Sequence, residues 1–117
     1  MAFKFEKLRV WQISLEYGET INDLSLKFPD YEKFNLASQI RRAADSVALN
    51  IAEGSVGQSN AEFGRFLGYS IRLLAEVVTC LYKVQLRKYI SREEFDRFYD
   101  DAFQRMNQIA ALRNSLK

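Results

Sequence analysis

Apolar residues recur along most of this chain with the three- and four-residue spacing that places them on one face of an α-helix. The helix that carries the first such stripe must end before Pro29, because a proline disfavours helical backbone at the residue that precedes it. This stripe consists of Val10, Ile13, Tyr17, Ile21, Leu24 and Phe28. The second consists of Leu36, Ile40, Ala44, Val47 and Ile51. The last consists of Phe95, Tyr99, Ala102, Met106, Ile109, Leu112 and Leu116.

Residues with known capping roles mark the ends of these segments. Gly54 follows the second stripe, and we expect it to end that helix in the left-handed conformation. Ser59 precedes Glu62 and Ser91 precedes Glu94 with the spacing of a capping box, in which the hydroxyl and the carboxylate bind free amide groups. These signals predict four helices, over about residues 8–28, 35–53, 60–89 and 92–116. Short connections and the lack of β-type alternation favour one all-α domain over residues 1–117, an antiparallel up-down four-helix bundle.

The composition narrows the chemistry that the chain can perform. It has 117 residues, of which 48% are hydrophobic, enough for one core, but it has no histidine and one cysteine. Histidine-dependent zinc, haem and catalytic sites are therefore excluded, and acidic residues at the start of the last helix complement its dipole. We predict no enzyme, no cofactor and no metal site.

The same sequence indicates where the protein resides. No stretch is apolar enough for a transmembrane helix, and the N-terminal residues lack the apolar core of a signal peptide. Cys80 has no second cysteine with which to pair, as is typical of a reducing compartment. We therefore expect a cytoplasmic protein without a membrane partner.

Positive charge concentrates on the third predicted helix. The segment from Ser55 to Ile90 holds five cations and two anions, whereas the whole chain carries +2. Projection at 100° per residue places four of these cations on one stripe together with Tyr69. They are Arg65, Arg72, Lys83 and Arg87. Such a stripe could follow a phosphate backbone, or it could be a solvated face on which Glu76 pairs with Arg72.

The apolar arc of the third helix is too broad for one core. Its members Leu73, Leu74, Tyr82 and Leu86 point in widely different directions, which indicates that some of them face a partner. Gly64 and Gly68 lie on its flank and would permit close approach of another helix, either from a second copy or inside the same bundle. We therefore predict a homo-oligomer.

A continuous polar stripe follows one face of the second helix. Its members are Gln39, Arg42, Ser46, Asn50 and Glu53. These groups could contact RNA bases or phosphates, lie across a subunit interface, or be solvated. Leu49 lies on the same side and indicates that part of this surface is covered in an assembly.

Two runs resemble a known family. Residues 39–47 read QIRRAADSV and residues 50–54 read NIAEG. Further matching positions are Phe5, Lys7, Leu8, Val10, Trp11, Gln12, Phe28, Pro29, Glu32, Phe34, Ser59, Glu62, Phe63, Phe66, Leu67, Glu76, Tyr89 and Ile90. Together they resemble the four-helix-bundle proteins encoded in intervening sequences of 23S ribosomal RNA genes. A departure is the stretch Val56, Gly57 and Gln58, where members of that family often carry a basic residue.

The resemblance implies a cytosolic homopentameric barrel, similar in form to the accessory protein of diversity-generating retroelements, which binds nucleic acid and a reverse transcriptase. From residues and resemblance together we predict a noncatalytic scaffold with weak electrostatic binding of RNA or DNA. The predicted nucleic-acid contacts are Arg42, Arg65, Tyr69, Arg72, Lys83 and Arg87. The predicted interface or recognition residues are Gln39, Ser46, Leu49, Asn50, Glu53, Gly64 and Gly68. The alternative is an adaptor that docks a partner protein and has no affinity for nucleic acid.

Overall fold

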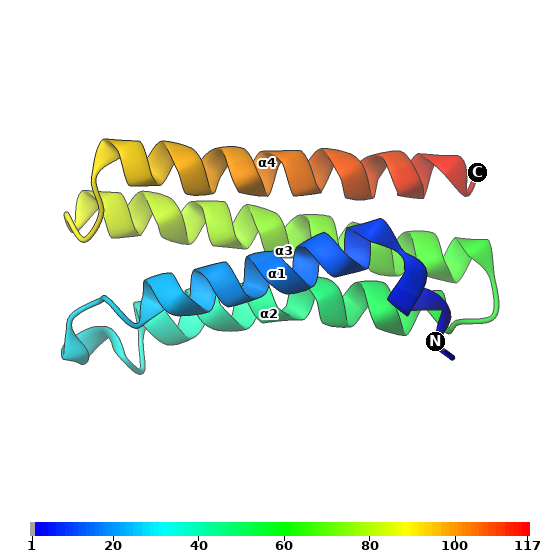
Figure 1. The fold of residues 1–117 in the computed structure, drawn as a ribbon, viewed down its shortest axis with the longest axis horizontal. Coiled ribbons are helices and arrows are strands. Elements are labelled where there is room, and N and C mark those ends of the chain that lie inside the picture. The colour runs from blue at the N-terminus through cyan, green and yellow to red at the C-terminus, as the bar shows by residue number, and fades with distance from the viewer. Residues whose placement is uncertain (1) are drawn as a thin grey trace.

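Four α-helices run antiparallel along the long axis of the computed structural model, which describes residues 2–117 (Figure 1). They are α1 (Arg9–Ser25), α2 (Leu36–Ser55), α3 (Asn60–Leu86) and α4 (Arg92–Ser115). Two short 3-10 helices, η1 (Lys4–Lys7) and η2 (Asp30–Glu32), precede α1 and α2. The predicted all-α four-helix bundle is confirmed for these residues, whereas assembly into a ring or barrel stays a prediction.

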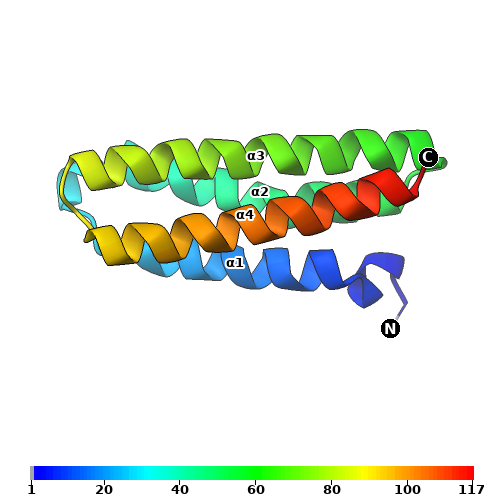
Figure 2. The same cartoon turned by 90° about the horizontal axis from the view of Figure 1, so that it is seen from above.

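Each helix packs mainly against its neighbours in the chain. The bundle measures 43 × 22 × 21 Å, and α2 and α3 make its most extensive contact. Viewed from above, α4 lies beside both α3 and α1, but its contact with α1 is sparse (Figure 2). Helix α3 therefore has α2 on one side and α4 on the other, which leaves its outer surface and two flanking grooves open to solvent.

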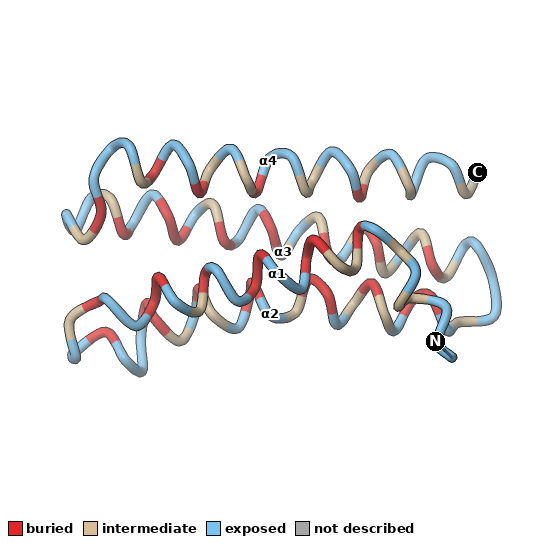
Figure 3. Tube along the Cα trace, viewed as in Figure 1, coloured by how far each residue is buried: buried red, intermediate tan, exposed pale blue. Residues whose placement is uncertain are grey.

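The core contains the stripes that the sequence predicts, together with buried residues of α3 such as Leu67, Leu74 and Val77. Every stripe residue of α1 and α2 is buried, as the inward-facing turns in Figure 3 show. On α4 the stripe is buried only at Phe95, Ala102 and Ile109, while its other members are half-buried. Phe98 of α4 is also buried, and its carbonyl oxygen accepts a hydrogen bond of 3.2 Å from the hydroxyl of Tyr17. No helix within residues 2–117 is both long enough and apolar enough to span a membrane.

The prediction that Gly54 ends α2 in the left-handed conformation is wrong. None of the glycines in residues 2–117 has a positive φ, and α2 continues to Ser55. Gly54 is instead buried where α2 meets α3, and a Cβ atom added there would lie 2.5 Å from the Cβ atom of Phe66. Nearby, the Ser70 hydroxyl of α3 donates a 2.9 Å hydrogen bond to the carbonyl of Val47. Glycine at position 54 therefore serves close packing of two helices.

Capping explains the start of α3 and α4. The hydroxyls of Ser59 and Ser91 each accept a 3.1 Å hydrogen bond from the amide three residues later. At Ser91 the carboxylate of Glu94 also accepts a 3.1 Å hydrogen bond from the serine amide, which completes the box. At Ser59 the Glu62 carboxylate turns toward Gly57 instead, so only half of the expected box forms.

The C-terminus of α3 differs from the expectation by three residues. The chain leaves the helix at Lys88, which has a φ of 64° and is the non-glycine residue with positive φ in the described range. Its amide donates to the carbonyl of Gln85 at 2.9 Å, and the Tyr89 amide donates to that of Val84 at 3.0 Å. This is the Schellman arrangement, in which glycine is the usual residue at the position of Lys88. Left-handed backbone is costly for a lysine, so this helix end could not be predicted from the residue at position 88.

The conformation of Lys88 predicts that Lys88→Gly stabilises the protein by about 1 kcal/mol, because glycine adopts positive φ without steric cost. Chemical unfolding by urea, followed by circular dichroism, measures the difference. Lys33→Gly is the matched control, since Lys33 has a φ of −53° and glycine gains nothing there. A Lys88→Gly variant no more stable than the wild type would contradict the prediction.

Gly54 and Gly64 have different surroundings, and these predict opposite effects of an alanine substitution on the stability of the fold. Gly54→Ala should destabilise the fold by about 1–3 kcal/mol, because its Cβ atom overlaps Phe66. Gly64→Ala should stabilise it by up to about 1 kcal/mol, because a Cβ atom there meets nothing within 4 Å and alanine favours helix. Thermal unfolding of both variants tests the pair. Equal shifts in the same direction would show that the α2–α3 approach does not limit residue size at position 54.

Candidate nucleic-acid interface

A cationic groove lies between α3 and the C-terminal half of α4. One hollow of about 200 Å³ is lined by three arginines, Arg65, Arg72 and Arg113, with Gly68, Tyr69 and Ile71. A second, of about 500 Å³, shares Arg65 and Arg113 with the first, so the two adjoin. Its other lining residues are Asn60, Ala61, Gly64, Leu116 and Lys117. No acidic side chain lines either hollow.

Within residues 2–117, the arginines of this groove form no ion pair. Within residues 2–117 the ion pairs are Arg87 with Glu32, Arg92 with Asp96, and Arg105 with Asp101. The pairing of Arg72 with Glu76 that the sequence allows does not form within 4.0 Å. The guanidinium of Arg65 stands over the ring of Phe66, at 5.8 Å from its centroid. The groove therefore presents uncompensated positive charge to solvent.

Gly64 and Gly68 open the groove rather than tighten the bundle. A Cβ atom at Gly64 would meet nothing within 4 Å, and one at Gly68 would lie 3.5 Å from the guanidinium carbon of Arg113. Tight packing inside one bundle, one of the two interpretations of these glycines, is therefore wrong for Gly64. Approach of a helix from a second copy stays a prediction.

The remaining cations of the predicted stripe lie farther along α3. Lys83 is exposed and lines neither hollow. The Nη1 atom of Arg87 donates a 2.6 Å hydrogen bond to the Oε2 atom of Glu32. Arg87 thus has an internal counter-charge, which distinguishes it from Arg65 and Arg72.

The broad apolar arc of α3 is only partly covered by the core. Leu74 is buried and Leu73 is half-buried, whereas Tyr82 and Leu86 are exposed. The expectation that these side chains cannot all face one core is confirmed.

Glu32 is the centre of a polar cluster at the end of the bundle where η2 meets the end of α3. It is 1% exposed. Its Oε2 atom accepts hydrogen bonds from Arg87 and from the Tyr89 hydroxyl at 2.7 Å, and its Oε1 atom accepts one from Asn35 Nδ2 at 3.1 Å. The hydroxyls of Tyr31 and Tyr89 lie 2.6 Å apart.

These contacts shift the pKa values of Glu32 and Tyr89 in opposite directions. The hydrogen bond from Tyr89, aided by Arg87, lowers the pKa of Glu32 below its ordinary value even though burial opposes this. Burial, together with hydrogen bonds to Tyr31 and Glu32, raises the pKa of Tyr89. The carboxylate is therefore ionised and the phenol neutral across the physiological range.

Some side chains of the α2 polar stripe hydrogen-bond to the helix backbone, and others extend into solvent. The Ser46 hydroxyl donates to the carbonyl of Arg42 at 2.8 Å, and Asn50 Nδ2 donates to the carbonyl of Ser46 at 2.9 Å. Gln39 and Arg42 make no side-chain hydrogen bond within the described residues. Leu49 is 59% exposed and Glu53 is also exposed, both outside the groove described next.

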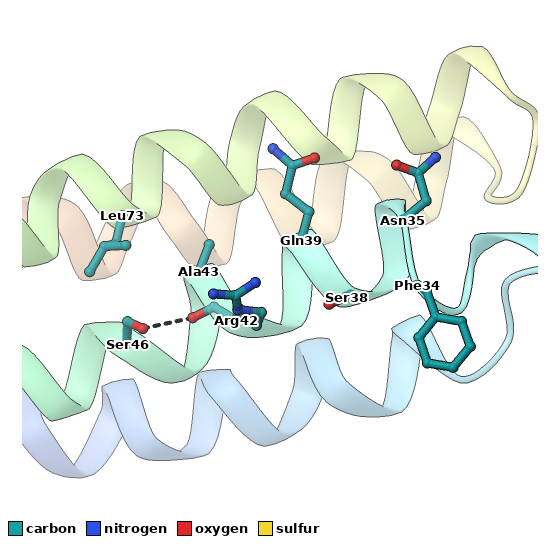
Figure 4. Close-up of a pocket in the computed structure, with 8 residues that line it drawn as sticks. All are labelled: Phe34, Asn35, Ser38, Gln39, Arg42, Ala43, Ser46 and Leu73. Atoms are coloured by element: carbon teal, nitrogen blue, oxygen red, sulfur yellow. Dashed lines mark hydrogen bonds between the residues drawn. The ribbon is translucent and has the colours of Figure 1, made fainter.

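Part of this stripe lines a groove of about 400 Å³ between α2 and α3, shown in Figure 4. Its lining residues are Phe34, Asn35, Ser38, Gln39, Arg42, Ala43, Ser46 and Leu73. The structure thus separates the predicted nucleic-acid contacts. Arg65, Tyr69 and Arg72 lie together on the α4 side of α3, while Arg42 lies on the α2 side. Nowhere in residues 2–117 do three or more acidic or cysteine side chains gather as a metal site would require.

Comparison with known proteins places the fold and these residues in context. The family model described as 23S rRNA-intervening sequence protein matches residues 6–111. The chain belongs to that family. A crystal structure of a protein with unknown function from the S23 ribosomal protein family of Bacteroides thetaiotaomicron superposes with a TM-score of 0.82 at 26% identity. The similarity covers 89% of this chain and 97% of that one. No curated protein matches the chain.

The match to the 23S rRNA-intervening sequence protein family includes most of the α3–α4 groove, the α2–α3 groove and the Glu32 cluster. The arginines at 65 and 72 and the whole α2 stripe lie within residues 6–111, whereas Arg113, Leu116 and Lys117 lie beyond them. Three side chains that matter here were not among the predicted site residues. They are Glu32, Phe34 and Arg113. Glu32 and Phe34 are among the positions that match the family, which could have identified them. Nothing in the sequence identified Arg113.

The lowered pKa of Glu32 predicts a pH-dependent stability. Because folding depresses the pKa, the stabilisation is fully present above the unfolded value of 4.5 and is lost as the pH falls through the folded one. Wild type should therefore unfold at a higher temperature than Glu32→Gln at pH 7, and the gap should shrink below about pH 4.5. Thermal unfolding of both proteins from pH 7 to about pH 3 measures it. A gap that stays constant with pH would mean that ionised Glu32 contributes nothing specific.

Proposed function

We propose that this protein is a noncatalytic, homo-oligomeric scaffold that binds nucleic acid, RNA in particular, through the α3–α4 groove. The observation that carries the proposal is the meeting of Arg65, Arg72 and Arg113 around one concave surface without an acidic neighbour. Guanidinium groups bind phosphate oxygens through paired N–H donors, and a duplex or single strand supplies such oxygens at regular intervals.

Tyr69 adds an aromatic surface to the same groove. Its side chain is 39% exposed between Arg65 and Arg72, and its ring stacks edge-on against Phe66 at a centroid distance of 5.4 Å. Aromatic rings beside arginines bind unpaired bases with little sequence preference. The arrangement supports binding of nucleic acid that is electrostatic, salt-sensitive and tolerant of sequence.

Self-association would multiply these contacts. Exposed apolar side chains such as Leu49 of α2 and Leu86 of α3 support a second copy covering part of the surface. Five copies, the number that the family resemblance implies, would carry a net charge of +10 and present the groove five times. Repeated weak sites raise the overall affinity without any tight single contact.

Reversal of groove charges should weaken binding. We expect Arg65→Glu with Arg72→Glu to lower the affinity for labelled single-stranded RNA by at least about tenfold at low salt, because two phosphate contacts become repulsive. Fluorescence anisotropy against single-stranded RNA, duplex RNA and duplex DNA, at low and physiological salt, measures the affinities and the salt slopes.

The control carries the same change of charge elsewhere. Arg9→Glu with Lys27→Glu alters two exposed cations that line neither hollow, and it should leave the affinity within about twofold. Light scattering confirms that each variant keeps the oligomer mass of the wild type. Equal losses in both double variants would show that only net charge matters, and no binding at low salt by an intact oligomer would favour a protein-docking adaptor.

A further inference from the structure

Phe34 stands almost wholly in water beside the groove between α2 and α3. It is 90% exposed, the highest exposure among the large apolar side chains of the described residues. It lies in the connection between η2 and α2, and the Nζ atom of Lys33 stands 5.5 Å from its ring centroid. No contact with the core explains a phenylalanine in this place.

The backbone beneath this ring is held in position. Two residues earlier, buried Glu32 binds Arg87 and Tyr89, and one residue later the Asn35 side chain donates to Glu32 at 3.1 Å. The Phe34 ring is therefore presented by a fixed segment, which lowers the entropy cost of binding a ligand on it.

Solvent-exposed polar groups that are free to bind a ligand adjoin the ring. Asn35 uses its amide nitrogen for Glu32 and leaves its oxygen available. Gln39 and Arg42 make no side-chain hydrogen bond within the described residues. In Figure 4 Asn35 and Gln39 extend from α2 toward α3, whereas the Phe34 ring lies at the end of the groove and points away from α3. The groove thus offers amide donors and acceptors, one guanidinium and one exposed ring.

We propose that this groove binds an unpaired nucleotide of a single strand, with its base stacked on Phe34. The amides of Asn35 and Gln39 then hydrogen-bond the base edge, and Arg42 binds the adjacent phosphate. Stacking on an aromatic side chain combined with such edge contacts is how proteins hold unpaired bases. The inference rests on the proposed function and names the part of the nucleic acid that the α2 side recognises.

The lining of the groove favours a nucleotide over a protein segment. Only Phe34, Ala43 and Leu73 among its eight lining residues are apolar, and none is acidic. Grooves that accept amphipathic helices are lined mainly by apolar side chains. A volume of about 400 Å³ lies within the range of small-ligand sites.

The two grooves can serve one strand. Arg72 lines the α3–α4 groove and Leu73, the next residue, lines the α2–α3 groove. A strand whose phosphates lie on Arg65 and Arg72 can therefore cross α3 at Leu73, and it reaches Phe34 by following the α2–α3 groove to its other end (Figure 4).

An oligonucleotide without bases separates stacking from charge. The probes are a fluorescein-labelled single-stranded RNA of about 12 nucleotides and an abasic ribose-phosphate chain of equal length. We expect Phe34→Ala to weaken binding of the RNA by roughly 5- to 150-fold, the range measured for loss of one stacking partner, and to leave the abasic chain unchanged. Phe34→Trp should restore binding and show quenched tryptophan fluorescence. Phe103→Ala, which removes another exposed phenylalanine on α4, is the matched control and should change neither affinity.

The outcomes separate this inference from the proposed function. If wild type binds both probes and Phe34→Ala binds the RNA equally well, the base site is refuted while the scaffold proposal stands. Equal weakening for both probes, or a change of oligomer mass by light scattering with unchanged affinities, also refutes it and assigns Phe34 to the fold or to a subunit interface. If wild type binds neither probe at low salt, the proposed function fails and this inference with it.

Discussion

The buried carboxylate of Glu32 determines the geometry of one end of the molecule. An ionised carboxylate is costly to remove from water unless other groups bind its oxygens, and here Arg87, Tyr89 and Asn35 bind both. The hydrogen bonds join the connection between α1 and α2 to the end of α3, two segments more than 50 residues apart. Phe34 is therefore presented by a segment that is held by these hydrogen bonds as well as by the buried side chains of Phe28 and Leu36 on either side of it.

Glycine is used in opposite ways on the two sides of α3. On the α2 side, Gly54 lets the helices approach so closely that even a methyl group would overlap Phe66. On the α4 side, Gly64 leaves space that no other residue in the range 2–117 fills, and Gly68 makes room for the Arg113 guanidinium. The first arrangement stabilises the bundle, while the second creates a hollow at a cost in helix propensity. Such a cost is consistent with a surface shaped for a ligand or a second copy.

The buried faces of the helices could be predicted from the sequence because they depend on the helical repeat. Features that depend on contacts between helices could not be predicted in this way. The stripes of α1 and α2 are buried in full because a 3.6-residue repeat determines which face a helix presents. The end of α3 at Lys88 was missed because the left-handed conformation there is adopted by a residue that disfavours it. Arg113 was missed because its place beside Arg65 depends on the register between α3 and α4, which no single helix encodes.

One chain has too few cations in its groove to bind nucleic acid tightly. An oligomer would compensate by repeating the groove. Each phosphate contact contributes a free energy that salt weakens, so on the proposed function three arginines would hold a strand only loosely at physiological ionic strength. On the proposed function, specificity for single strands comes instead from the aromatic surfaces at Tyr69 and Phe34, which salt affects far less. An oligomer then adds strength by repetition, because a strand released from one groove is retained by the next. On this proposal, the arginine grooves and the aromatic rings have complementary roles.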